Sequence, residues 1–204
     1  MFDPKYKFTC VDRFLKYVKY DTQSDEESTL FPSTEKQKKL SADLAKELKK
    51  MGLKDAVMDK WGYVRATLPS NTKKKVPPIA FISHVDTSPA VTGKNVKPII
   101  HKKYRGGDIK LPKGGWVIKV KDNPDLKNMK GFDIITTDGT TLLGADNKAG
   151  VAEIMDAVNY LLVHPEVKHG PIKICFTPDE EVGRGTEKIN LKKLGAKYAY
   201  TVDG

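Results

Sequence analysis

Residues 79–86 carry the sequence IAFISHVD, in which four apolar residues run directly into polar ones. Pro77 and Pro78 come immediately before this run. A short apolar run that is bounded by prolines is typical of a buried strand. The sequence therefore predicts a strand over residues 79–82 that delivers His84 and Asp86 at its carboxyl end.

Two later runs repeat this design. Residues 172–176 are mainly apolar and lead into an acidic triplet at 179–181. Residues 198–202 form another strand-like run, which leads into Asp203. The sequence thus predicts three strands that each end in side chains able to bind a metal ion.

Helical patterns alternate with these strands. Apolar residues recur at helical spacing in the stretches 11–18, 40–51 and 151–162, and Asp146 stands before the third. Residues 89–133 are rich in Gly, Pro and Lys, which predicts an irregular excursion with short strands. The alternation of strands and helices predicts an α/β domain.

Local signals place the second helix and a hairpin. Thr34 followed by Gln37 predicts a capping box at the start of that helix, and Gly52 can adopt the left-handed conformation that ends it. Residues 55–58 and 63–68 flank a turn and predict a β-hairpin.

Length and charge limit the function classes. The chain has 204 residues, a little over one domain at about 150 residues per domain. Its net charge of +10 comes from scattered lysine clusters without interleaved aromatic residues, so we expect a solvated surface and no nucleic-acid partner. No apolar run approaches the ~18 residues that span a bilayer, and the first residues lack a signal-peptide pattern. We therefore expect no membrane partner and a cytoplasmic location.

The carboxyl ends of strands in an open α/β sheet form a crevice that collects side chains from distant positions. We expect His84, Asp86, Asp146, Asp203 and the acidic pair 180–181 to meet there. Carboxylates that lie together raise one another's pKa unless a cation relieves them. Histidine among carboxylates suits zinc, so the pattern favours a zinc site.

Each signal also has a purely structural alternative. His84 and Asp86 could form a hydrogen-bonded surface pair, and the triplet 179–181 could favour the start of a following helix. Other catalytic patterns are missing, since the sequence has no phosphate-binding loop, complete dinucleotide fingerprint or Cys-x-x-Cys motif. Ser83 is not expected to meet His84, because neighbouring strand residues point to opposite faces. The coincidence of the acidic signals at strand ends favours the metal site.

At these residues the sequence resembles the M20 family of co-catalytic zinc peptidases over almost its whole length. The motifs that carry the resemblance are YDTQS (20–24), PST (32–34), SHVDTS (83–88), LGADNKAG (143–150), FTPDEEVGRG (176–185) and VDG (202–204). Asn147 departs from the aspartate pair of the family motif, but the first member of that pair, Asp146, is intact. The resemblance implies a three-layer α/β/α zinc-peptidase-like catalytic domain with a mixed sheet and flanking helices.

The resemblance also implies a set of metal ligands. Asp146 would bridge two zinc ions, His84 and Asp203 would complete the first ion, and Glu181 would bind the second. The two ions would share and activate a water molecule.

Two further residues receive catalytic roles from the resemblance. Glu180 would be the general base that moves a proton to the leaving amine. Asp86 would accept a hydrogen bond from the far ring nitrogen of His84 and so fix the tautomer that faces zinc.

The ligand count for the second ion is low. Asp146 and Glu181 are two ligands, whereas catalytic zinc usually takes three from the protein. His101, His164 and His169 are expected to be surface residues away from the site. In the resembled family the third ligand is a histidine far downstream, beyond a lid and dimerisation domain. We therefore expect residues 1–204 to be the amino-terminal part of the catalytic domain, without that lid, the closing strands and the third ligand.

The function that the resemblance implies is a zinc-dependent aminopeptidase that releases the amino-terminal residue of tripeptides. We expect this chain alone to be inactive, and a possible homodimer for the full-length protein. One alternative is another amidohydrolase of the same family, such as a dipeptidase or deacylase. An alternative from a different class is a basic, non-catalytic nucleic-acid-binding module, which only the net charge supports.

Overall fold

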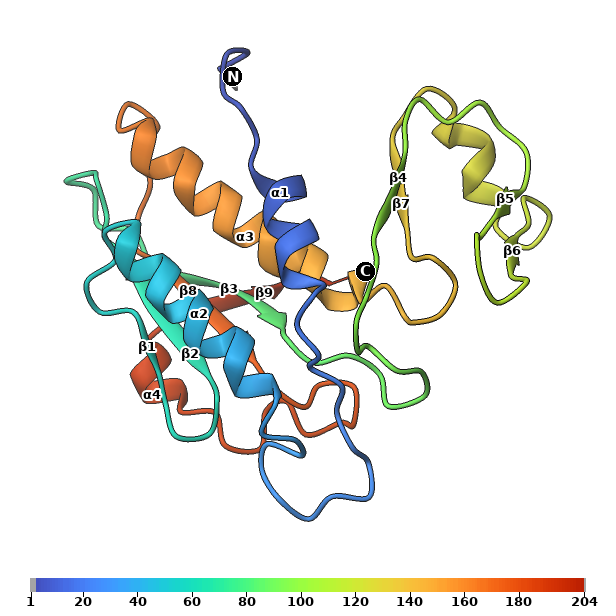
Figure 1. The fold of residues 1–204 in the computed structure, drawn as a ribbon. Helices are drawn as coiled ribbons and strands as arrows, with labels where there is room; N and C mark the ends of the chain where they lie inside the picture. The colour runs from blue at the N-terminus through green and yellow to red at the C-terminus, as the bar shows by residue number, and fades with distance from the viewer. Residues whose placement is uncertain (1–2, 204) are drawn as a thin grey trace.

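The computed structural model describes residues 3–203 (Figure 1). Its main sheet has five strands in the order β1-β2-β8-β3-β9. These strands are β1 (Val57–Met58), β2 (Val64–Leu68), β3 (Ile79–His84), β8 (Ile172–Thr177) and β9 (Tyr198–Thr201). The α-helices are α1 (Cys10–Tyr17), α2 (Gln37–Lys50), α3 (Ala145–Val163) and α4 (Leu191–Leu194).

The sheet is mixed, as the sequence predicts. β3 lies between β8 and β9 and runs parallel to both, whereas β1 and β2 are antiparallel to their neighbours. The register pairs His84 with Thr177 of β8, and Ile82 with Thr201 of β9. Because parallel strands end at the same edge of a sheet, the carboxyl ends of β3, β8 and β9 converge.

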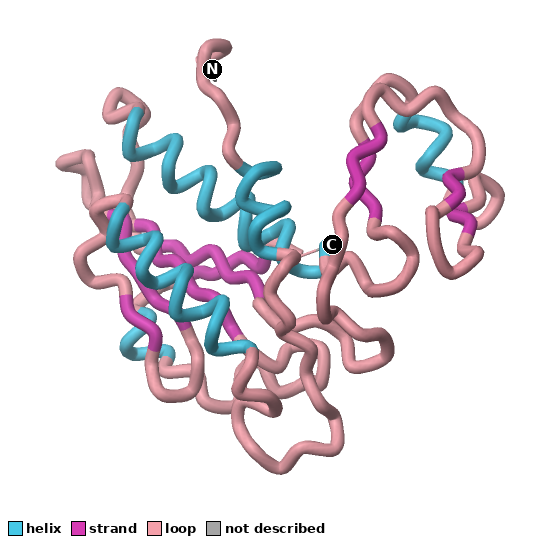
Figure 2. The backbone as a smooth tube through the Cα atoms, in the orientation of Figure 1, coloured by secondary structure: helices cyan, strands magenta, loops and turns pink. Residues whose placement is uncertain are grey.

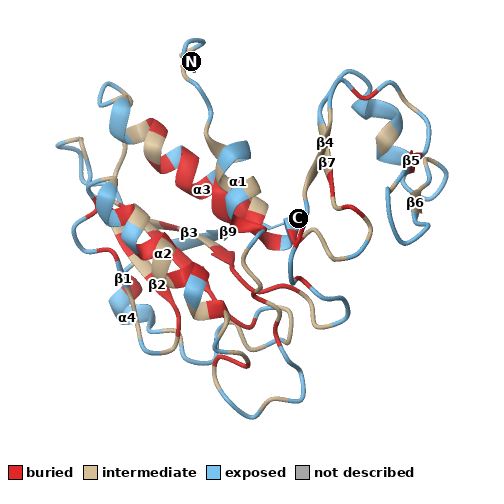
Figure 3. Ribbon diagram, in the orientation of Figure 1, coloured by how far each residue is buried: buried red, intermediate tan, exposed pale blue. Residues whose placement is uncertain are grey.

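The helices α1, α2 and α3 cover one face of the sheet (Figure 1). On α2, Leu40, Leu44 and Leu48 are spaced four residues apart and are completely buried. They belong to one apolar core with Val64 and Ile174 of the sheet. Figure 3 shows the buried residues gathered between these helices and the strands. Burial of this apolar stripe stabilises the packing of α2 on the sheet.

The other face carries a smaller core. Ala80, Cys175 and Leu194 form its buried centre, and Ile82 and Ile189 pack against them. Leu194 is the last residue of α4, so this short helix supplies the second helical layer. The expected three-layer α/β/α architecture is therefore confirmed, with a thin second layer.

The chain between β3 and α3 forms a lobe that carries β4 to β7 and projects from the rest of the domain (Figures 1 and 2). The lobe contains two small antiparallel ladders and a six-residue 3-10 helix. Its elements are β4 (Ile99–His101), β5 (Ile109–Lys110), β6 (Val117–Ile118), η1 (Pro124–Met129) and β7 (Ile134–Thr136). This agrees with the predicted irregular, strand-containing excursion.

The predicted hairpin is present as the antiparallel pair β1 and β2, but the predicted capping box is wrong. Helix α2 begins at Gln37, and no side chain caps its amino terminus. The hydroxyl of Thr34 instead donates to the carbonyl of Gln23 at 2.7 Å. The side-chain amide of Gln37 donates to Oδ1 of Asp179, which is far away in the sequence, at 2.6 Å. Gly52 follows the helix with a φ of 105°, as expected for its end.

No helix among residues 3–203 is long and apolar enough to cross a membrane. The cytoplasmic location stays a prediction from the sequence.

We expect Leu44→Ala to lower the free energy of unfolding by about 2–5 kcal/mol, because it leaves a cavity in the completely buried face of α2. Urea denaturation followed by circular dichroism measures this loss. The matched control is Leu30→Ala, since Leu30 is 68% exposed and its truncation should change stability by less than about 0.5 kcal/mol. Equal effects of the two substitutions would contradict the assigned core.

Candidate metal centre

His84 is the last residue of β3 and is 2% exposed. Its partner in the parallel ladder is Thr177, the last residue of β8. Asp203 lies two residues beyond the end of β9, on the other side of β3. The strand order therefore brings the imidazole between two chain segments that carry carboxylates.

The carboxylates surround one nitrogen of His84. Its Nε2 atom lies 2.8 Å from Oδ1 of Asp146, 3.7 Å from Oε2 of Glu180 and 3.8 Å from Oδ1 of Asp203. A carboxylate oxygen of Glu181 also lies within 4.8 Å of a ring nitrogen of His84 and of an Asp146 oxygen. All the site residues expected from the sequence thus lie together.

Asp86 is on the opposite side of the ring and is completely buried. Its Oδ1 lies 3.3 Å from Nδ1 of His84, and the backbone carbonyl of Asp86 lies 3.1 Å from the same nitrogen. Oδ1 and Oδ2 accept the backbone N–H groups of Glu180 and Glu181 at 3.0 and 3.1 Å. One carboxylate therefore orients the imidazole and fixes the backbone of the acidic pair.

The segment that carries Asp146 is tied to two strands. Gly144 adopts the left-handed conformation before α3, and Asp146 and Asn147 have non-helical torsions joined by a cis peptide bond. The Asn147 amide donates to the carbonyl of Val202 at 2.7 Å, and the Ser83 hydroxyl donates to the carbonyl of Asn147 at 3.1 Å. These bonds place Asp146 beside the end of β3, and they show that Ser83 faces away from His84, as expected.

The cluster favours a bound cation. Burial lowers the pKa of His84, but the hydrogen bond and charge of Asp86, with the charges of Asp203 and Glu180, raise it to about 9. Burial raises the pKa of Glu181, and the charge of Asp146 raises it further. Without a metal ion, a proton on the imidazole supplies the positive charge that the carboxylates require.

The donor set fits a metal ion. Two groups of three ligand atoms lie within 4.8 Å of one another, His84 with Asp146 and Glu181, and His84 with Glu180 and Asp203. Imidazole nitrogen and carboxylate oxygens are ordinary ligands of zinc and of other divalent transition metals. The division of the ligands between two ions stays a prediction.

The other histidines among residues 3–203 bond elsewhere. Nε2 of His101 lies 2.9 Å from the hydroxyl of Thr136 in the lobe. His164 pairs with Glu166 at 2.8 Å, and His169 bonds to the carbonyl of Gly170. None of them belongs to either candidate metal group.

A lysine next to the site went unnoticed in the sequence. Lys148 is 1% exposed, and its Nζ donates to the carbonyl of Tyr20 at 2.8 Å. Burial lowers its pKa to about 8, although the negative charges of Asp21 and Asp86 act to raise it. The sequence does indicate that Lys148 is buried, because Lys148 shares a helix face with the apolar Val151, Ala152 and Met155.

Sequence and structure comparisons give a consistent picture. No family model matches the chain. A peptidase T of Caldanaerobacter subterraneus subsp. tengcongensis is 57% identical over 195 residues, which is 95% of this chain and 48% of that protein. The aminopeptidase PepT of Bacillus cereus has a TM-score of 0.66 at 27% identity, over 96% of this chain and 43% of that one. A tripeptidase of Staphylococcus aureus has a TM-score of 0.64 at 26% identity, over 96% and 43%.

The matches cover most of this chain but only about half of each curated relative. This chain is matched almost from end to end, but it spans about half the length of the curated relatives it matches. The resemblance inferred from the motifs, and the peptidase-like fold that it implied, are confirmed for the part of the fold that this chain contains.

We expect Asp86→Asn to lower the free energy of unfolding by about 1–3 kcal/mol, because asparagine keeps only one accepting oxygen and leaves the N–H of Glu180 or of Glu181 facing an amide nitrogen. Urea denaturation measures the change. The matched control is Asp108→Asn, because this exposed carboxylate also accepts a backbone N–H, that of Val120, where water can take its place. A loss for Asp86→Asn no greater than for the control would contradict the role of Asp86.

Proposed function

Because this chain belongs to the peptidase T family, we propose that it supplies the metal centre of an aminopeptidase that removes the amino-terminal residue from tripeptides. The observation that carries the proposal is the convergence of one buried imidazole and four carboxylates at the carboxyl ends of three parallel strands. Fold likeness alone does not fix an activity, so the side chains at the site support the reaction class.

The proposed cofactor is zinc, with two ions in the complete site. His84, Asp146 and Asp203 would bind one ion. Asp146 would also bind the second ion, together with Glu181. When bound, zinc lowers the pKa of a water molecule and stabilises negative charge on a carbonyl oxygen. With zinc bound, the Nδ1–H of His84 would donate to Asp86, which would leave the lone pair of Nε2 for the metal ion.

Glu180 is the proposed general base. Its side chain is 54% exposed and its Oε2 lies 3.7 Å from Nε2 of His84, so it borders the centre and remains open to substrate. It would take a proton from the attacking water and deliver it to the amine that leaves. Its neighbour Glu181 is more enclosed, and its raised pKa agrees with a carboxylate that a cation would relieve.

The substrate class rests on the relatives. The curated relatives are named peptidase T, and one of the solved relatives is a tripeptidase of Staphylococcus aureus. The alternatives are a dipeptidase or deacylase of the same fold, and a solved aminoacylhistidine dipeptidase with a TM-score of 0.56 shares the fold at 19% identity. The nucleic-acid alternative has only the charge of +10 to support it. A homodimer of the full-length protein stays a prediction.

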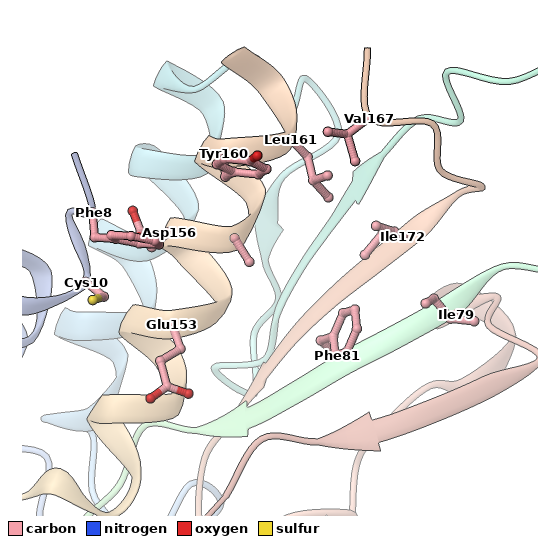
Figure 4. Close-up of a pocket in the computed structure, with 11 residues that line it drawn as sticks. Phe8, Cys10, Ile79, Phe81, Glu153, Asp156, Tyr160, Leu161, Val167 and Ile172 are labelled. Carbon is pink, nitrogen blue, oxygen red and sulfur yellow. The ribbon is translucent and has the colours of Figure 1, made fainter. Parts of the chain in front are cut away.

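We further propose that the chain is the amino-terminal part of the catalytic domain, and that additional chain packs on it in the complete enzyme. Strand β9 is the sheet edge, and all its residues are exposed (Figure 3). An open groove of about 680 Å³ lies between α3 and the sheet, where Phe81 and Ile172 face α3 (Figure 4). An unpaired edge and an open apolar groove both favour packing by further chain.

We expect Glu180→Gln to lower kcat for tripeptide cleavage by about 10²–10⁴-fold with little change in zinc content, because it removes the proton acceptor. Asp146→Asn should instead reduce zinc content, because Asp146 contributes to both ions. The measurements are elemental analysis and cleavage rates on a polypeptide as long as the curated relatives, with tripeptides, dipeptides and acyl-amino acids as substrates.

The matched control is Asp133→Asn, an exposed carboxylate in the lobe that pairs with Lys102. It should alter neither zinc content nor rate. Faster cleavage of dipeptides or acyl-amino acids than of tripeptides would contradict the proposed tripeptide substrate and favour a dipeptidase or a deacylase. A full-length protein that holds no zinc, cleaves none of these compounds and binds nucleic acid in a salt-dependent manner would overturn the proposal in favour of the binding module.

A further inference from the structure

Asp179 lies two residues beyond β8, directly before Glu180 and Glu181, and it is completely buried. Its φ of 57° is in the left-handed region. Few residues other than glycine adopt this conformation, and aspartate is among those that tolerate it. The chain therefore turns sharply at the position that directs the two glutamates.

The segment before α2 holds this turn. Oδ2 of Asp179 accepts the backbone N–H of Ser33, and Oδ1 accepts the Ser33 hydroxyl and the side-chain amide of Gln37, each at 2.6 Å. In return, Oε1 of Gln37 accepts the backbone N–H of Asp179 at 3.1 Å. We call Ser33, Gln37 and Asp179 the acidic-loop clamp. Ser33 is 5% exposed and Gln37 is completely buried, so water does not compete for these bonds.

The clamp comes from a different segment of the chain than Asp86. Asp86 accepts the N–H groups of Glu180 and Glu181, whereas the clamp fixes the residue just before them. The turn is closed by the N–H of Arg184, which donates to the carbonyl of Asp179 at 2.8 Å. The backbone of residues 179–181 is therefore held through both neighbouring segments.

We propose that the acidic-loop clamp positions Glu180 and Glu181 for metal binding and proton transfer. Ser33, Gln37 and Asp179 are positioning residues, because they act through the backbone of the glutamates and not on substrate. The inference rests on the proposed function for the roles of the two glutamates. Bonds that orient ligating side chains typically affect metal affinity 10–100-fold, which gives the expected scale.

A purely structural role is the competing explanation, and the chain offers a matched control. Asp156 is also a buried carboxylate, and it accepts the Tyr6 hydroxyl and both the N–H and the hydroxyl of Thr9. These bonds hold the amino-terminal segment against α3, away from the glutamates. Asp156→Asn therefore removes a comparable buried acceptor without altering the acidic loop.

The test compares Asp179→Asn, Gln37→Glu and the double variant. In Asp179→Asn, an amide nitrogen replaces one of the two accepting oxygens and faces either the Ser33 N–H or the Gln37 amide donor, so at least one clamp bond is lost. In Gln37→Glu, two carboxylates face each other. The double variant reverses the polarity of the pair, since the new amide of residue 179 can donate to the new carboxylate of residue 37. Ser33→Ala, which keeps the backbone N–H, is a milder variant to use if the others fail to fold.

Two readouts separate the clamp from the proposed function. Hydrogen exchange of the Glu180 and Glu181 amides in metal-free chain reports their bonds to Asp86, and it should be about tenfold faster in the single variants. Zinc affinity, measured by competition with a chromophoric chelator, should fall by about tenfold or more. The double variant should recover most of both losses, and Asp156→Asn should change neither.

Each result decides one of the two proposals. If Asp156→Asn matches Asp179→Asn on both readouts at equal loss of thermal stability, or if the double variant recovers nothing, the clamp has no specific positioning role. If the unsubstituted protein binds no zinc, the proposed metal centre fails, while the exchange rates of the two amides still decide whether the clamp holds the acidic loop.

Discussion

The buried carboxylate of Asp86 is the contact on which the site depends. A buried charge is costly unless it is paired and hydrogen-bonded, and here both oxygens accept backbone N–H groups while one also faces the imidazole. These partners come from β3 and from the loop after β8. They can meet only because the two strands are parallel neighbours whose ends are in register. The sheet topology thus determines the orientation of His84 and of the acidic pair together.

This arrangement concentrates negative charge around one nitrogen. Asp146, Glu180 and Asp203 all approach Nε2 of His84, and their charges with that of Asp86 favour a cation there. A cluster that served only stability would be expected to contain its own permanent cations at the centre. Lys148 is close, but its ammonium is directed to the backbone carbonyl of Tyr20. The charge balance therefore supports a centre built to receive metal.

The strands and site residues could be predicted because their signals are local. The apolar run before His84, and the similar runs before the acidic triplet and Asp203, each identify a strand and its polar end. The start of α2 could not be predicted in this way, because the Thr34 hydroxyl bonds to Gln23 before the helix and the Gln37 side chain bonds to Asp179, which is far away in the sequence. For the same reason the role of Asp179 was missed, since an aspartate beside two glutamates gives no sign that it is buried. The thin second helical layer also depends on packing around Leu194 that no periodicity reveals.

The site divides its residues by exposure. Two carboxylates that would meet substrate or metal, those of Asp146 and Glu180, are more than half exposed. The imidazole of His84 and the carboxylates of Asp86 and Asp179 are buried. Open carboxylates on long side chains have rotamer freedom, so their precision has to come from the backbone that carries them. The two buried aspartates supply it through two different segments, Asp86 from the end of β3 and Asp179 through the segment before α2. The reactive groups can then stay accessible while the geometry of the centre is set by contacts that substrate and solvent do not reach.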